Sequence, residues 1–113
     1  MADTCEPRAK RQCVGLPPVG YGTYKLDAGE AERCVTCALR AGYRLIDTAQ
    51  IYNNEKGVGR AIAKAGLPRD DLFVTSKVWR THHGYERARK SCLQSLKDLG
   101  LEYLDLMLIH WST

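Results

Sequence analysis

The feature that most constrains the fold is a repeat in which an apolar strand pattern is followed by a helical pattern. The expected strands are residues 19–24, 43–48, 72–78 and 104–111. The strands recur about every 30 residues, which is the length of one β-α-β unit. The later strands are nearly continuous apolar runs, as is typical of parallel strands that are covered on both faces. The repeat therefore predicts a parallel sheet with helical crossovers.

Local signals indicate where the helices begin and end. Asp27 followed three residues later by Glu30 resembles a capping box, and Gly42 follows that helix as a C-terminal stop. Asn53 or Asn54 is expected to cap the second helix. The third helix is expected over residues 85–99, with a buried stripe formed by Ala88, Cys92, Leu96 and Leu99.

Four parallel strands and three helices make up the first half of an eight-fold barrel. We therefore predict an α/β fold of the (β/α)8 TIM-barrel class, whose usual length is about 250 residues. Residues 15–113 would form the N-terminal part of that barrel domain, and residues 1–14 a mobile polar tail. An open flavodoxin-like sheet is the alternative. It is disfavoured because catalytic groups at consecutive strand ends converge more naturally in a barrel.

Composition excludes several classes of protein. The sequence has no apolar run of about 18 residues, so no membrane span is expected. Residues 1–13 lack the apolar centre of a secretory signal. The net charge of +4 is modest and the basic residues are interspersed with acids, which favours a solvated surface over a nucleic-acid interface. A phosphate-bearing cofactor would also suit the positive excess.

The cysteines and histidines do not suggest a metal site. The five cysteines are irregularly spaced, which fits a reducing compartment and hence the cytoplasm. Cys34 and Cys37 form a CxxC pair inside a helical pattern, so we interpret them as helix-packing residues. His82 and His83 are expected in an exposed loop without an acidic partner at ligand spacing.

Ionisable side chains occur where the later strands end. Asp47, Lys77 and His110 each lie at the C-terminal end of an expected strand, and Tyr52 lies in the polar turn after Asp47. Barrel and open α/β enzymes place their chemistry at this end of the strands. We therefore predict that the four side chains converge in an active site.

The four groups together suit proton donation to a carbonyl compound. A free phenol has a pKa near 10, and a neighbouring ammonium would lower that pKa in Tyr52. Lys77 can supply the ammonium, Asp47 can pair with it, and His110 can hydrogen-bond a carbonyl oxygen and orient it. None of the four supplies a hydride, so a nicotinamide cofactor is needed.

Each of these residues also has a structural interpretation when taken alone. Asp47 could cap the following turn, and Tyr52 could be a half-buried packing residue. Lys77 could be a solvated charge and His110 a satisfied core histidine. Three aromatic side chains beside the polar cluster predict an apolar substrate pocket, with ordinary packing as the alternative. They are Tyr24, Trp79 and Trp111.

Several stretches of the sequence resemble the aldo-keto reductase family closely. They are residues 20–25, 42–49 followed by 52–55 and 58–59, 75–79, and 104–111. The similarity extends over residues 16–111. It implies an (α/β)8 barrel that binds NADPH and reduces an aldehyde or ketone. The implied catalytic residues are Asp47, Tyr52, Lys77 and His110; the cofactor-binding residues are Gly22, Thr23, Tyr24 and Asp47; and the substrate-binding residues are Tyr24, Trp79, His110 and Trp111.

The sequence also departs from the family pattern. The family usually has a proline after the His-Trp pair, where this chain has Ser112. The second half of the family's barrel, which carries most contacts to the cofactor phosphates, is absent. One alternative is therefore a truncated, inert fragment that acts at most as an interaction module. Another is a lyase or aldolase that uses Lys77 as a Schiff-base nucleophile, which the pairing with Asp47 disfavours.

The expected partners follow from this interpretation. The substrate would be a small carbonyl compound, with no nucleic acid and no membrane involved. The full-length form would be a monomer. An isolated half barrel would tend to self-associate, because it leaves two unpaired sheet edges and an uncovered apolar face.

Overall fold

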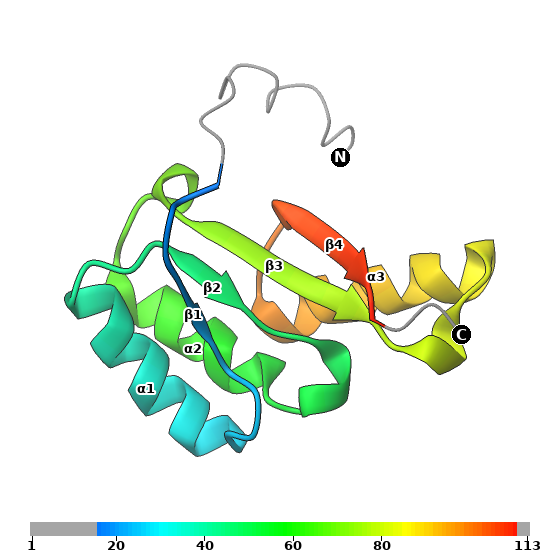
Figure 1. Cartoon of the computed structure of the whole chain (residues 1–113), viewed down its shortest axis with the longest axis horizontal. Helices are drawn as coiled ribbons and strands as arrows, with labels where there is room; N and C mark the ends of the chain where they lie inside the picture. The colour runs from blue at the N-terminus through cyan, green and yellow to red at the C-terminus, as the bar shows by residue number, and fades with distance from the viewer. Residues whose placement is uncertain (1–15, 111–113) are drawn as a thin grey trace.

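The computed structural model describes residues 16–110, which form a parallel β-sheet with α-helices packed along it (Figure 1). The strands are β1 (Gly20–Gly22), β2 (Leu45–Asp47), β3 (Phe73–Val78) and β4 (Leu106–Ile109), and the helices are α1 (Ala28–Arg40), α2 (Glu55–Ala65) and α3 (Tyr85–Leu99). Short 3-10 helices cover Gln50–Tyr52, Arg69–Asp71 and Arg80–His82. The expected tail (1–14) and Trp111 lie outside the described residues.

The strands follow one another in chain order across the sheet, β1-β2-β3-β4, and every neighbouring pair is parallel. Each helix connects one strand to the next. This is the strand order of a barrel, whereas a flavodoxin-like sheet places its strands out of chain order. The four parallel strands and three helices match the expectation for the first half of a (β/α)8 barrel.

The hydrophobic core lies between the helices and one face of the sheet. Side chains alternate between the two faces of a strand, so Ile46 and Val74 point toward the helices and are fully buried. Asp47 and Lys77, one and three positions further along the chain, point to the opposite face. The core consists of Ala31, Val35, Leu39, Ile46, Val58, Ala61, Ile62, Leu72, Val74 and Leu99.

The capping box at the start of α1 is confirmed. The Asp27 carboxylate accepts a hydrogen bond from the Glu30 N–H at 2.8 Å, and the Glu30 carboxylate accepts one from the Asp27 N–H at 3.0 Å. Gly42 follows the C-cap residue of α1 with φ of 108°, a conformation that glycine adopts without strain. Both ends of this helix are therefore set by local sequence.

Two glycines allow α2 to pack closely against its neighbours. A Cβ at Gly57 would lie 2.0 Å from the carbonyl oxygen of Ala28 at the start of α1. A Cβ at Gly59 would lie 2.4 Å from the carbonyl oxygen of Leu99 at the end of α3. Side chains larger than hydrogen would force these backbones apart. The glycines thus allow α2 to pack closely between α1 and α3.

The predicted buried stripe of α3 is wrong in part. Leu99 is buried, but Ala88, Cys92 and Leu96 are only half-buried. The other buried residues of this helix are Ser91 and Ser95. The most buried face is polar because the Ser95 hydroxyl donates to the buried carboxylate of Glu55 and accepts from the half-buried amide of Gln50.

Strand β4 differs from the expectation of strands covered on both faces. Leu108 is 40% exposed and Ile109 is 68% exposed. Within residues 16–110, β4 pairs only with β3, so its outer edge carries unpaired backbone groups. No helix in this part of the chain combines the length and apolar character needed to cross a membrane.

Candidate active site

The predicted site residues meet at the C-terminal end of the sheet, on the face turned away from the helices. Asp47 ends β2, Lys77 is the penultimate residue of β3, and His110 follows β4. The register pairs Lys77 with Leu108, so side chains at positions 77, 108 and 110 share one face. Tyr52 ends the 3-10 helix after β2. The fold therefore brings four separated residues together.

Lys77 is held by three oxygen atoms. Its Nζ lies 2.9 Å from each carboxylate oxygen of Asp47 and 3.0 Å from the carbonyl oxygen of Thr48. The Lys77 side chain is 14% exposed and that of Asp47 is 40% exposed. An ammonium has three N–H donors, and all three are accounted for, so its position is well defined. A lysine paired in this way is a poor Schiff-base nucleophile.

Tyr52 lies between Lys77, His110 and Tyr24. Lys77 Nζ is 5.3 Å from the centroid of the Tyr52 ring. The ring of His110 is 5.9 Å away and nearly perpendicular, at 86°. The ring of Tyr24 is 5.2 Å away and tilted by 52°. The phenol is therefore fixed by aromatic contacts and lies within reach of a positive charge.

His110 has a lowered pKa. The main cause is loss of hydration on burial, the positive charge of Lys77 adds to it, and the negative charge of Asp47 opposes it. The ring therefore carries no charge at pH 7. Its Nδ1 is buried and has no hydrogen-bond partner among the described residues. The ring of Trp79 packs against it with centroids 5.4 Å apart at 79°.

A buried polar network lies beneath the site. Thr23 Oγ1 is 2.9 Å from Thr48 Oγ1, which donates to Asn54 Oδ1 at 3.0 Å. The Asn54 amide donates to the carbonyl oxygens of Thr23 and Leu26, both at 2.9 Å. Thr23, Thr48 and Asn54 are fully buried. The network joins the ends of β1 and β2 to the start of α2.

This network changes the interpretation of two residues. Asn54 occupies the predicted N-cap position of α2, but its side chain makes no cap hydrogen bond because its amide is used in the network. The hydroxyl of Thr23 faces Thr48 and the backbone of Asp47 rather than open space. Its role as a cofactor contact stays a prediction.

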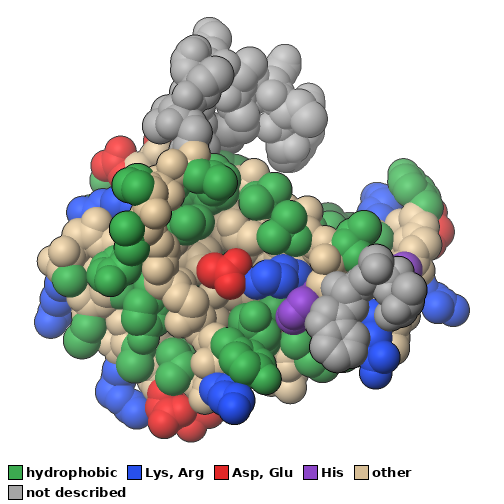
Figure 2. Space-filling model, viewed as in Figure 1, with side chains coloured by type: hydrophobic (Ala, Val, Ile, Leu, Met, Phe, Trp, Pro, Cys, Tyr) green, Lys and Arg blue, Asp and Glu red, His purple; other side chains and the backbone are tan. Residues whose placement is uncertain are grey.

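Gly22 and Tyr24 border open space beside the ion pair. Gly22 pairs in register with Asp47, and no heavy atom lies within 4 Å of where its Cβ would be. Tyr24 is 66% exposed. In the space-filling view, an acidic, a basic and a histidine side chain adjoin near the middle of this face, among hydrophobic side chains (Figure 2). Among the described residues, Gly22 and Tyr24 thus leave room beside the Asp47–Lys77 ion pair.

A second polar cluster, absent from the sequence-based predictions, lies on the helix side of the same strand ends. It is formed by Gln50, Glu55, Ser76, Ser91 and Ser95. Burial raises the pKa of Glu55, while hydrogen bonds from Ser76 and Ser95 oppose that rise. The sequence signal for this cluster is the pair Ser91 and Ser95, spaced i, i+4 on α3. The predicted apolar stripe of this helix did not include them.

Among residues 16–110 no group of three or more histidine, cysteine or acidic side chains is arranged to hold a metal ion. Cys34, Cys37 and Cys92 are free thiols. Cys34 and Cys37 lie within α1 as expected, but Cys37 is exposed, so its predicted role in helix packing is wrong, whereas Cys34 is half-buried.

Comparison with known proteins places these features in a family. The sequence model of the aldo/keto reductase family matches residues 13–113. An aldo-keto reductase of Mycobacterium avium (strain 104) is 54% identical over 96 residues, which cover 85% of this chain and 34% of that protein. A 9,11-endoperoxide prostaglandin H2 reductase of Trypanosoma cruzi (strain CL Brener) is 48% identical over 99 residues, covering 87% and 35%.

A solved structure shows the same fold. The crystal structure of MGS-M4, an aldo-keto reductase enzyme from a Medee basin deep-sea metagenome library, superposes with a TM-score of 0.85 at 48% identity. The match covers 88% of this chain and 36% of that one. The predicted barrel class is thereby confirmed. The chain spans about a third of the length of the relatives it matches.

Proposed function

This chain belongs to the aldo/keto reductase family, and we propose that its site serves the NADPH-dependent reduction of an aldehyde or ketone to an alcohol. One observation carries the proposal. An ammonium fixed by three oxygen atoms stands 5.3 Å from the ring centroid of Tyr52. A positive charge beside a phenol assists transfer of the phenolic proton.

Tyr52 is the proposed proton donor. Its hydroxyl gives a proton to the oxygen of the carbonyl group as that oxygen becomes an alkoxide. Lys77 stabilises the negative charge that develops on the phenol, and Asp47 holds the Lys77 ammonium in place. Proton transfer by a positioned side chain contributes a rate factor of about 10² to 10⁴.

His110 is proposed to orient the substrate. Its lowered pKa keeps the imidazole neutral at pH 7, and a neutral imidazole has one N–H donor and one acceptor nitrogen. Because Nδ1 is buried without a partner among the described residues, we assign the proton to Nε2. The Nε2–H would then bond the carbonyl oxygen and turn it toward Tyr52.

The cofactor fits the open space at the end of β1. The missing side chain at Gly22 leaves room for a flat ring beside Asp47, and the exposed ring of Tyr24 offers a stacking surface next to Tyr52. The hydroxyl of Thr23 bonds Thr48. Thr23 is proposed to contribute to cofactor binding by fixing its chain neighbours Gly22 and Tyr24. NADPH would supply the hydride that no side chain here can supply.

Aromatic side chains support a substrate with an apolar body. Tyr24 and His110 pack against Tyr52, and Trp79 packs against His110. Trp111, outside the described residues, remains a proposed fourth contact. Pockets lined by aromatic rings with a few polar groups are typical of small-molecule sites. A cytoplasmic location is proposed as well, supported by three free thiols in the described part of the chain.

The test is NADPH oxidation by the purified chain in the presence of an aldehyde, compared with Tyr52→Phe. Phenylalanine keeps the ring contacts with Tyr24 and His110 and removes only the hydroxyl. We expect the rate to fall about 10²- to 10⁴-fold with unchanged NADPH affinity, followed by cofactor fluorescence. Equal rates for both proteins would contradict the role of Tyr52.

A second candidate is an inert chain that acts at most as an interaction module. It is favoured by the observation that the chain spans about a third of the length of its relatives. In that case the NADPH fluorescence measurement would detect no cofactor binding, and no aldehyde would accelerate NADPH oxidation.

A further inference from the structure

Glu55 is a buried carboxylate that the proposed chemistry does not use. It is the first residue of α2 and is 6% exposed. Ser76 donates to one of its oxygens at 2.6 Å, and Ser95 donates to the other at 3.1 Å. Both serines are fully buried. A carboxylate removed from water is costly unless such donors replace its hydration.

The hydrogen bonds continue from Ser95 to Gln50. The Gln50 amide donates to Ser95 Oγ at 3.1 Å and to the Ser91 carbonyl oxygen at 2.8 Å. Its carbonyl oxygen accepts from the backbone N–H of Trp79 at 3.3 Å. Both N–H groups and the oxygen of this amide are thus in use. The result is a continuous bridge, Ser76–Glu55–Ser95–Gln50–Trp79.

The bridge residues flank both Tyr52, the proposed proton donor, and Lys77 in the chain. Gln50 and Glu55 lie on either side of Tyr52 in the chain, and Ser76 and Trp79 lie on either side of Lys77. Ser76 alternates with Lys77 along β3, so the bridge lies on the helix side of the sheet while Lys77 and Tyr52 meet on the opposite side. The Glu55–Ser76 and Gln50–Trp79 hydrogen bonds join the two segments directly. Ser95 on α3 joins Glu55 to Gln50.

We propose that this bridge positions Tyr52 against Lys77, with Gln50, Ser95 and Glu55 as positioning residues. The inference rests on the proposed function for its catalytic consequence. The 3-10 helix that carries Tyr52 is three residues long and cannot fix the phenol through its own backbone bonds alone. A misplacement of about 1 Å at a reacting group can cost about 100-fold in rate.

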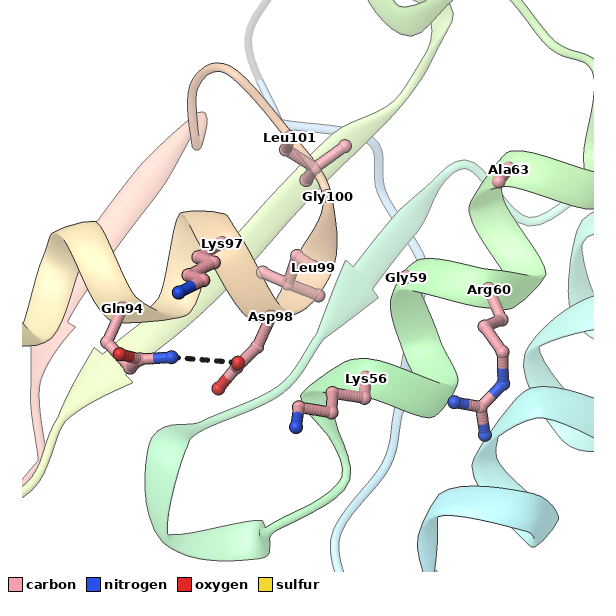
Figure 3. A pocket seen from close by; sticks show the side chains of 10 residues that line it. All are labelled: Lys56, Gly59, Arg60, Ala63, Gln94, Lys97, Asp98, Leu99, Gly100 and Leu101. Atoms are coloured by element: carbon pink, nitrogen blue, oxygen red, sulfur yellow. Dashed lines mark hydrogen bonds between the residues drawn. The ribbon is translucent and has the colours of Figure 1, made fainter.

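Gln94 on α3, next to Ser95 in the chain, provides a matched control. Gln94 lines a groove of about 550 Å³ between α2 and α3, and its amide donates to Asp98 at 2.9 Å (Figure 3). It is an exposed glutamine whose amide bonds Asp98 and no residue of the bridge. Gln50→Leu and Gln94→Leu therefore make the same chemical change, but only the first breaks the bridge.

The experiment uses the whole chain labelled with ¹³Cε-lysine, with the Lys77 signal assigned by its loss in Lys77→Arg. Lys77 Nζ lies 5.3 Å from the centroid of the Tyr52 ring, so we expect the NMR signal of the adjacent Cε methylene to carry a ring-current shift. We expect Gln50→Leu and Ser95→Ala to move this signal and to lower kcat for aldehyde reduction about 10- to 100-fold. The KM for NADPH should change less than about threefold, and Gln94→Leu should change neither quantity.

Each other outcome would overturn the inference. An unmoved Lys77 signal in folded Gln50→Leu and Ser95→Ala would show that the bridge does not position this pair. A moved signal with unchanged kcat would show that the position is irrelevant to the reaction. Failure of both variants to fold would assign the bridge to stability alone. If the wild-type chain reduces no aldehyde, the proposed function fails, and the Lys77 signal still decides whether the bridge positions the pair.

Discussion

Lys77 on β3 and Asp47 on β2 form an ion pair in which both carboxylate oxygens accept hydrogen bonds from Nζ, each at 2.9 Å. The carboxylate is 40% exposed, whereas the lysine side chain is 14% exposed. Solvent can therefore hydrate Asp47 in the absence of its partner. Solvent screening at the exposed carboxylate limits the contribution of this partly buried pair to stability. The ammonium lies 5.3 Å from the centroid of the Tyr52 ring, where its charge can act on the phenol.

We expect Lys77→Met to lower the rate of aldehyde reduction by about 10²- to 10⁴-fold while the chain stays folded. Methionine keeps the length of the side chain and removes the charge next to Tyr52. NADPH oxidation measures the rate, and circular dichroism measures the fold. Lys56→Met, at an exposed lysine on α2, is the control. Wild-type activity in Lys77→Met would contradict the role of the ammonium.

Asn54→Asp tests the network under the site. The substitution replaces the amide that donates to the carbonyl oxygens of Thr23 and Leu26. The Thr23 oxygen keeps the N–H of Leu26 at 3.3 Å, whereas the Leu26 oxygen loses the Asn54 donor. The free energy of unfolding should therefore fall by about 1–3 kcal/mol. Urea unfolding followed by circular dichroism measures it.

The neighbouring residue supplies the control for that change. Asn53 is exposed and has φ of 55°, a conformation that aspartate also tolerates. Asn53→Asp should alter stability by no more than about 0.5 kcal/mol. Equal effects of the two substitutions would mean that the buried amide contributes nothing specific.

Gly57→Ala tests the close packing of α2 on α1. Its Cβ would lie 2.0 Å from the backbone oxygen of Ala28, so the helices must separate, at a cost of about 1–3 kcal/mol. Gly29→Ala, on α1, meets only side-chain atoms at 3.5 Å or more and should stabilise the chain by up to about 1 kcal/mol. Thermal melts of both variants measure the contrast, and a stable Gly57→Ala would refute the packing argument.

Local sequence signals predicted the helices well. The capping box of Asp27 and Glu30, the stop at Gly42 and the span of α3 depend on residues that are close in the chain. The convergence of Asp47, Lys77 and His110 was also predictable, because parallel strands in chain order bring their C-terminal ends to one edge.

The buried polar contacts could not be predicted in the same way. Ser95 bonds Glu55 and Gln50 across 40 and 45 residues of sequence, and no local pattern encodes a partner at that distance. The polar face of α3 was therefore missed. Asn54 was given the commoner role of a helix cap, because its partners Thr23 and Leu26 lie in a different β-α unit.

The lowered pKa of His110 predicts a specific pH dependence of stability. The pKa in the folded chain lies below the ordinary value of 6.5 because of burial and the Lys77 charge. The unfolded chain thus binds a proton more readily than the folded chain. The resulting loss of stability is complete below the folded pKa, and it disappears as pH rises through 6.5.

Melting temperatures of the wild type and His110→Asn across this pH range measure the effect. The wild type should gain stability relative to the variant as pH rises to about 7, and the difference should then stay constant. The other ionisable groups are the same in both proteins, so their contributions to the difference in stability cancel. If the melting temperatures of the wild type and His110→Asn differed by the same amount at every pH, the lowered pKa of His110 would be contradicted.

The outer edge of β4 predicts self-association of the isolated chain. Ile109 is 68% exposed and Leu108 is 40% exposed, on a strand whose far edge is unpaired among the described strands. Exposed apolar edges pair with other chains, and a lysine on the edge prevents this. Sedimentation equilibrium should show concentration-dependent association that Ile109→Lys reduces. Leu93→Lys, at a leucine 52% exposed on α3, adds the same charge away from the edge and should leave association unchanged. A monomeric wild type at every concentration would contradict the prediction.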